Sequence, residues 1–145
     1  MNYLWYTALI EGDSMSDFDN AVYWLDSAEY DLQTARAMLE TQRLLYVGFM
    51  CHQAIEKVLK GVLISRKPEE ELPYIHKLRR PANLSGISEE MSVEQLSLLD
   101  VLSPLNIETW YPLHKSRLLE SLTVERCEKM IQETEALYLW LKKKC

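Results

Sequence analysis

The sequence is poor in the residues that break helices and in those that build disulfide or metal frameworks. Only four glycines and five prolines occur in 145 residues, and this scarcity favours long helices over a turn-rich β-fold. The three histidines lie too far apart in the chain to suggest a zinc site. The three cysteines, Cys51, Cys127 and Cys145, have no C-x-x-C spacing and an odd count, which argues against a disulfide framework and favours a reducing cytoplasm. We expect no metal and no cofactor, and we expect Cys51 and Cys127 to pack in the core.

Long apolar runs and an excess of positive charge are also missing. No stretch approaches the ~18–20 apolar residues that cross a bilayer. The apolar start, residues 1–10, has no basic region before it and acidic residues directly after it, so we do not expect a secretion signal. The net charge of −6 disfavours a general nucleic-acid binder. We expect a cytoplasmic protein with an N-terminal segment, 1–15, and one folded domain, 16–145.

Apolar residues recur at steps of three and four over three long stretches, which predicts three long helices. The first helix is expected from about residue 16 to 39, capped by Ser16 with Asp19; the second runs from about 44 to 65 and the last from about 123 to 143. Ser92 and Gln95 form a capping box that predicts a shorter helix ending near Pro104. Residues 68–90 are expected to form a loop with one helical turn around 75–79, and residues 106–113 an irregular segment.

Amphipathic helices of this kind bury their apolar stripes only by packing together. The sequence therefore predicts an all-α fold, an antiparallel up-and-down four-helix bundle with short additional helices. Gly48 inside the second helix costs about 1 kcal/mol relative to alanine, which indicates close approach of a neighbouring helix. A short bundle with this many aromatic residues is expected to expose an apolar patch, and a homodimer is the commonest way to cover one.

The second helix also carries the most specific motif of the chain. Residues 51–61 read Cys-His-Gln-Ala-Ile-Glu-Lys-Val-Leu-Lys-Gly. This run resembles the signature of the HEPN domain family, Gln-Ala-x-Glu-Lys-x-x-Lys-(Ala/Gly). The Trp-Leu-x-x-Ala-Glu pattern at 24–29, the Pro-x-x-His loop at 73–76 and the Thr-Trp-Tyr-Pro run at 109–112 are similar to further family motifs in the expected order.

The resemblance implies a bundle fold and two alternative functions. Many HEPN proteins are metal-independent ribonucleases that use an Arg-x(4–6)-His motif across a homodimer, and others are helical partners of a minimal nucleotidyltransferase, in toxin–antitoxin or related pairs. No Arg-x(4–6)-His motif occurs in this sequence, and Trp110 stands where many relatives have arginine. We therefore expect a non-catalytic module that homodimerises and binds a nucleotide or partners a nucleotidyltransferase. The alternative is a ribonuclease with a degenerate or rearranged active site.

The candidate ligand-binding residues centre on the second helix. His52, Glu56 and Lys60 follow one another at four-residue steps and share a helical face, so they can line a phosphate pocket. Equally, they can form a network of i,i+4 pairs that contribute about 0.2–0.5 kcal/mol each. The predicted ligand-binding residues are His52, Gln53, Glu56, Lys57, Lys60, His76 and Tyr111.

Candidates for catalysis are weaker. His114 and Arg117 share a face if their segment is helical, in reversed order relative to the family motif; the alternative is an exposed polar turn. His76 lies in a loop with three basic residues that can contact an anion, although a hydrogen-bonded structural histidine is the commoner case. Trp24, Trp110, Tyr111 and Trp140 can stack a base, but such aromatics usually belong to a core or an interface.

Overall fold

The computed structural model describes residues 17–72, 77–106 and 112–145, and these residues contain helices and no strands. The all-α prediction is confirmed. The elements are α2 (Asp17–Glu40), α3 (Leu44–Arg66), α4 (Arg79–Ser85), the 3₁₀ helix η1 (Ile87–Glu90), α5 (Val93–Leu102), the 3₁₀ helix η2 (Ser103–Leu105), α6 (Pro112–Ser121) and α7 (Val124–Lys142). Among the described residues, no helix is long and apolar enough to cross a membrane.

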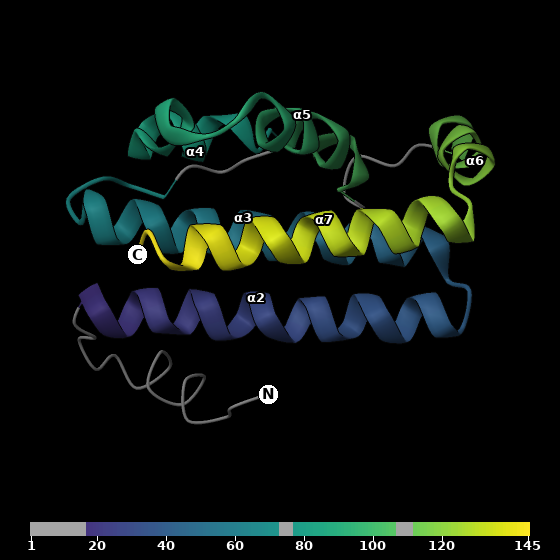
Figure 1. The fold of residues 1–145 in the computed structure, drawn as a ribbon, viewed down its shortest axis with the longest axis horizontal. Coiled ribbons are helices and arrows are strands. Elements are labelled where there is room, and N and C mark those ends of the chain that lie inside the picture. Colours follow the sequence, from purple (N-terminus) through teal and green to yellow (C-terminus); the bar gives the residue numbers. More distant parts are fainter. Residues whose placement is uncertain (1–16, 73–76, 107–111) are drawn as a thin grey trace.

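The four main helices, α2, α3, α5 and α7, alternate in direction along the bundle, as expected for up-and-down topology (Figure 1). Figure 1 shows α2 at the bottom, α3 and α7 in the middle, and α4 with α5 above them. The short helix α6 lies at the end of the bundle where α2 turns into α3. This arrangement gives α3 neighbours on several sides, and its stretch from Leu45 to Leu63 is accordingly largely buried.

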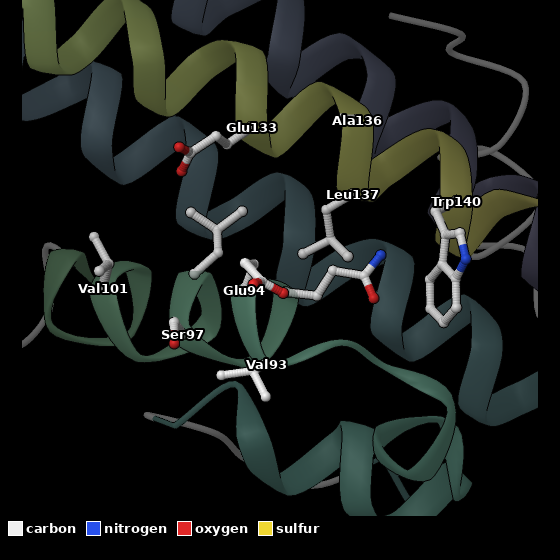
Figure 2. Close-up of a pocket in the computed structure, with 10 residues that line it drawn as sticks. Val93, Glu94, Ser97, Val101, Glu133, Ala136, Leu137 and Trp140 are labelled. Carbon is white, nitrogen blue, oxygen red and sulfur yellow. The ribbon is translucent and has the colours of Figure 1, made fainter.

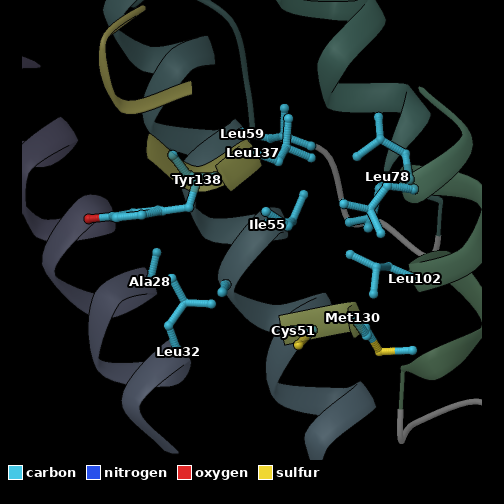
Figure 3. Close-up of a cluster of buried hydrophobic side chains, with 14 of the residues drawn as sticks. Ala28, Leu32, Cys51, Ile55, Leu59, Leu78, Leu102, Met130, Leu137 and Tyr138 are labelled. Atoms are coloured by element: carbon cyan, nitrogen blue, oxygen red, sulfur yellow. The ribbon is translucent and has the colours of Figure 1, made fainter. Parts of the chain in front are cut away.

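The core forms where the apolar stripes of these helices meet (Figure 3). Ala28 and Ala35 are fully buried on α2, and such small side chains let α3 approach closely. Ile55 and Leu59 of α3 lie at the centre, and burial of a side chain of this size contributes about 1.5–3 kcal/mol. Cys51 and Cys127 are also fully buried, which confirms their predicted place in the core.

Local signals in the sequence set several helix boundaries correctly. The hydroxyl of Ser92 accepts a hydrogen bond from the Gln95 amide at 3.1 Å, and the Gln95 side chain accepts one from the Ser92 amide at 2.9 Å. The predicted capping box is thus present. Thr123 caps α7 in a similar way, accepting from the Arg126 amide at 3.1 Å. Ser16, the predicted cap of the first helix, lies outside the described residues.

The prediction of a loop over residues 68–90 is wrong for its second half, because residues 79–85 form α4 and residues 87–90 form η1. Pro81 lies in the first turn of α4, where a missing amide hydrogen breaks no helical bond. Leu78 and Ala82 are fully buried, so tertiary packing stabilises a helix too short to show a clear periodicity. Gly86 follows α4 with a φ of 81°, a left-handed conformation that glycine adopts at helix ends without strain.

The region around Pro112 differs from the prediction in a related way. The irregular segment was expected to extend to residue 113, but α6 begins at Pro112, which suits the first position of a helix. Residues 107–111 lie outside the described residues. The predicted close approach at Gly48 is present, because a Cβ atom there would lie 3.0 Å from Cδ1 of Leu105 in η2.

Candidate functional site

Two groups of paired polar side chains on α2 and α3 make up what we call the charged cluster: the row His52, Glu56 and Lys60 along α3, and the pair Asp31 and Lys57 between the two helices. Lys57 Nζ lies 2.7 Å from Oδ2 of Asp31 and therefore links α3 to α2. Lys60 Nζ lies 3.4 Å from Oε1 of Glu56, one helical turn earlier. The four-residue spacing of His52, Glu56 and Lys60 thus places these three side chains in one row, as predicted.

His52 occupies the innermost position of the charged cluster. Its side chain is fully buried, and Nδ1 lies 2.8 Å from the carbonyl oxygen of Leu102 at the end of α5. Because a carbonyl oxygen only accepts hydrogen bonds, Nδ1 carries the proton and donates it. Nε2 makes no hydrogen bond among the described residues and lies 3.7 Å from Oε2 of Glu56. The ring therefore ties α3 to α5 and has no access to solvent.

The two carboxylates of the charged cluster respond differently to their surroundings. Burial raises the pKa of Asp31 by more than the neighbouring Lys57 ammonium lowers it, so the pKa lies above its ordinary value. Burial also acts to raise the pKa of Glu56, but the His52 ring and the Lys60 ammonium together outweigh burial and lower the pKa. Each lysine faces a carboxylate, so the cluster contains no unmatched cation when His52 is neutral.

The remaining predicted ligand-binding residues lie at the edge of the cluster or outside the described residues. Gln53 is half-buried on α3. The side chains of Lys57 and Lys60 keep 22% and 19% of their surface exposed, and Lys60 Nζ lies 5.0 Å from the centre of the Trp24 ring. His76 and Tyr111, together with the stacking candidate Trp110, lie outside the described residues.

A groove between α5 and α7, which we call the α5–α7 groove, was not predicted from the sequence (Figure 2). It has a volume of about 550 Å³. Its lining is mainly apolar and consists of Val93, Glu94, Gln95, Ser97, Leu98, Val101, Glu133, Ala136, Leu137 and Trp140. One wall of the groove could have been recognised from the sequence, because Val93 and Val101 are eight residues apart and therefore share a face of α5. Their side chains are 76% and 50% exposed.

Among the described residues, no group of three or more histidine, cysteine or acidic side chains is arranged to hold a metal ion. Burial raises the pKa of Cys51 to about 12, so its thiol stays protonated at neutral pH and is a poor nucleophile.

Comparison with known proteins agrees with this geometry. A model of the HEPN domain family matches residues 21–144, a span that contains all of α3 and α7. This chain belongs to the HEPN family. The HEPN match and the all-helical fold together confirm the resemblance inferred from α3.

A solved structure supports the same fold for this HEPN chain. The protein TT1696 from Thermus thermophilus superposes with a TM-score of 0.73 at 20% identity, over 87% of this chain and 98% of that one. At this identity the likeness concerns the fold alone. No curated protein sequence matches the chain.

The HEPN signature of this chain overlaps the charged cluster, since Glu56, Lys57 and Lys60 belong to both and lie on α3. The weaker catalytic candidates lie elsewhere. His114 and Arg117 are on α6, where Arg117 is exposed, and that helix is at one end of the bundle (Figure 1). The segment is helical, as their shared face requires, and is separate from the signature helix.

Proposed function

We propose that this HEPN domain is a non-catalytic helical module that homodimerises and acts by binding a protein partner, as the HEPN partners of nucleotidyltransferases do in toxin–antitoxin type pairs. The observation that carries the proposal is that the polar groups of the charged cluster are already paired or buried within the bundle. Its lysines are each matched by a carboxylate, and its histidine is buried.

Cleavage of a phosphodiester needs a proton-transferring group within reach of the substrate and a positive charge for the developing anion. His52 is fully buried and donates Nδ1–H to Leu102, so it offers no such group to a bound RNA. Drawing Lys57 or Lys60 toward a phosphate would leave Asp31 or Glu56 as an unpaired, mostly buried carboxylate, which costs several kcal/mol. The cluster is therefore better suited to holding the bundle together than to chemistry.

Nucleotide binding is the second candidate, and the exposed edge of the cluster favours it. About a fifth of each lysine side chain reaches solvent, 22% for Lys57 and 19% for Lys60, next to the Trp24 ring. ATP bound there would raise the melting temperature, because a ligand that binds only the folded state stabilises it. A shift with ATP would favour this candidate, and flat shifts with all nucleotides would count against it.

Incubation with labelled RNA in the absence of metal tests the absence of catalysis. We expect the RNA to stay intact. Cleavage that is lost in His114→Ala but kept in Lys115→Ala, a neighbour on the same exposed helix, would establish the ribonuclease alternative with a rearranged site. Sedimentation tests the homodimer separately, and a monomer at micromolar concentration would contradict that part of the proposal.

A further inference from the structure

We infer that the α5–α7 groove is the docking site for one amphipathic helix of a protein partner, with an apolar face flanked by lysine or arginine. The inference rests on the proposed function and adds the surface and the chemistry of the partner.

The shape of the α5–α7 groove fits a helix. Val93, Ser97 and Val101 repeat at four-residue steps along one wall, and Ala136 and Trp140 do the same along the other (Figure 2). Side chains at this spacing on two neighbouring helices form a trough along their length, into which an amphipathic helix lays its apolar face. Small residues on both walls, Ser97 and Ala136, leave room for the backbone of a third helix.

The apolar surface in the α5–α7 groove is partly uncovered. Val93 is 76% exposed and Val101 is 50% exposed, whereas Leu98 and Leu137 below them are buried. A partner helix lying along the groove would cover both valines, which are two helical turns apart on α5, and remove them from water. The volume of about 550 Å³ lies within the range of about 300–1,000 Å³ that is usual for binding pockets.

Charge decides which occupant fits. Glu94 stands on the α5 wall and Glu133 on the α7 wall, so negative charge borders the groove on both sides (Figure 2). Among the described residues, Glu133 forms one ion pair, with Lys129 at 3.6 Å in an exposed position that solvent screens, and Glu94 forms none. A basic helix is attracted by this border. A second copy of the chain, with its net charge of −6, suits this acidic border less well than a basic helix, so the proposed homodimer is expected to form through another face.

The test uses two synthetic peptides of about 18 residues, roughly five helical turns. Both carry the same leucine and tryptophan stripe; one is flanked by lysine and the other by glutamate. Fluorescence anisotropy with the full chain is expected to show about tenfold tighter binding of the lysine peptide, with the difference shrinking as salt is added. Equal binding of the two peptides would overturn the inference.

Variants locate the site. Ser97→Arg fills the groove and is expected to weaken binding of the lysine peptide about tenfold. Leu139→Arg is the matched control, because Leu139 is 56% exposed on α7 and does not line the groove. The paired change Glu94→Lys with Glu133→Lys is expected to reverse the preference between the peptides. If Ser97→Arg does not fold, Ala136→Arg on the opposite wall takes its place.

Other outcomes separate this inference from the proposed function. Equal effects of Ser97→Arg and Leu139→Arg would overturn the groove as the binding site. A homodimer that dissociates in Ser97→Arg but persists in Leu139→Arg would assign the groove to a second copy and overturn the basic partner. If neither peptide binds while RNA stays intact, the inference about the groove fails and the proposed function stands. If RNA is cut while the lysine peptide binds, the proposed function fails and the groove stands as a docking site.

Discussion

Replacement of Lys57 by methionine tests whether the charged cluster holds α2 against α3. Lys57 Nζ lies 2.7 Å from Oδ2 of Asp31, and the two side chains are 22% and 11% exposed. Breaking a fully buried pair by removal of one partner costs about 3–5 kcal/mol, because the other charge stays buried without compensation. Since both groups keep some contact with solvent, we expect Lys57→Met to lower the free energy of unfolding at neutral pH by about 2–3 kcal/mol.

The pH dependence gives this prediction a definite sign. The pKa of Asp31 is raised above its ordinary value of 3.8, chiefly by burial, and loss of Lys57 raises it further. The folded state therefore binds a proton more tightly than the unfolded chain, and the ionised carboxyl costs stability above its folded pKa. As the pH falls through that pKa, Asp31 becomes neutral in the folded variant, and the difference in stability from the natural chain should shrink.

The assay is urea unfolding followed by circular dichroism, over a series of pH values that begins at about pH 7 and continues downward through the titration of Asp31. Lys129→Met is the control, because Lys129 and Glu133 form a pair 76% and 48% exposed at 3.6 Å, where we expect a loss of at most about 0.5 kcal/mol. The double variant Lys57→Met with Asp31→Leu should recover most of the loss. A Lys57→Met penalty no larger than that of the control, or one that does not change with pH, would refute the reasoning.

Three further predictions follow from single contacts. With a thiol reagent at mildly alkaline pH, exposed Cys145 should react first. Cys51 is fully buried and its pKa is raised to about 12, so it should react only after unfolding. Early modification of Cys51 in a peptide map would contradict its burial. Ser92→Ala removes the cap of α5 and should cost about 1 kcal/mol in urea unfolding, while retention of full stability would mean that the cap contributes nothing. His52→Leu leaves the Leu102 carbonyl without its donor and should cost about 1–3 kcal/mol, and an unchanged urea midpoint would show that this bond is dispensable.

The long helices were predictable because their apolar periods repeat over many turns, so a few exceptions do not hide the pattern. The start of α5 was predictable for a different reason, since the Ser92–Gln95 box is a purely local interaction. The helix α4 was not predictable in this way. It has seven residues and contains Pro81, and it is stabilised by burial of Leu78 and Ala82 against the bundle, which only the folded arrangement provides.

The candidate site shows the same limit. Four-residue spacing placed His52, Glu56 and Lys60 on one face, but spacing does not say whether that face meets solvent or another helix. His52 is buried against Leu102, which lies 50 residues away in sequence and packs beside it in the folded chain. Spacing within one helix cannot predict such a contact. The contact of Lys57 with Asp31 depends on the register of two helices. The α5–α7 groove depends likewise on how two helices pack, which no local pattern specifies.

The layered order of the bundle has a consequence for how its parts come apart. The α4–α5 layer covers α3 and α7 on the side away from α2 (Figure 1). Lifting α5 would uncover the buried Leu98, Leu99 and Leu102 and break the bond of His52 to Leu102, but it would leave α2 packed on α3 and α7. Local opening of this kind needs less free energy than complete unfolding and exposes amides to hydrogen exchange. A helix bound across α5 and α7 would hold the α4–α5 layer against the bundle. Slower hydrogen exchange of the α5 amides would therefore be a sign of that binding.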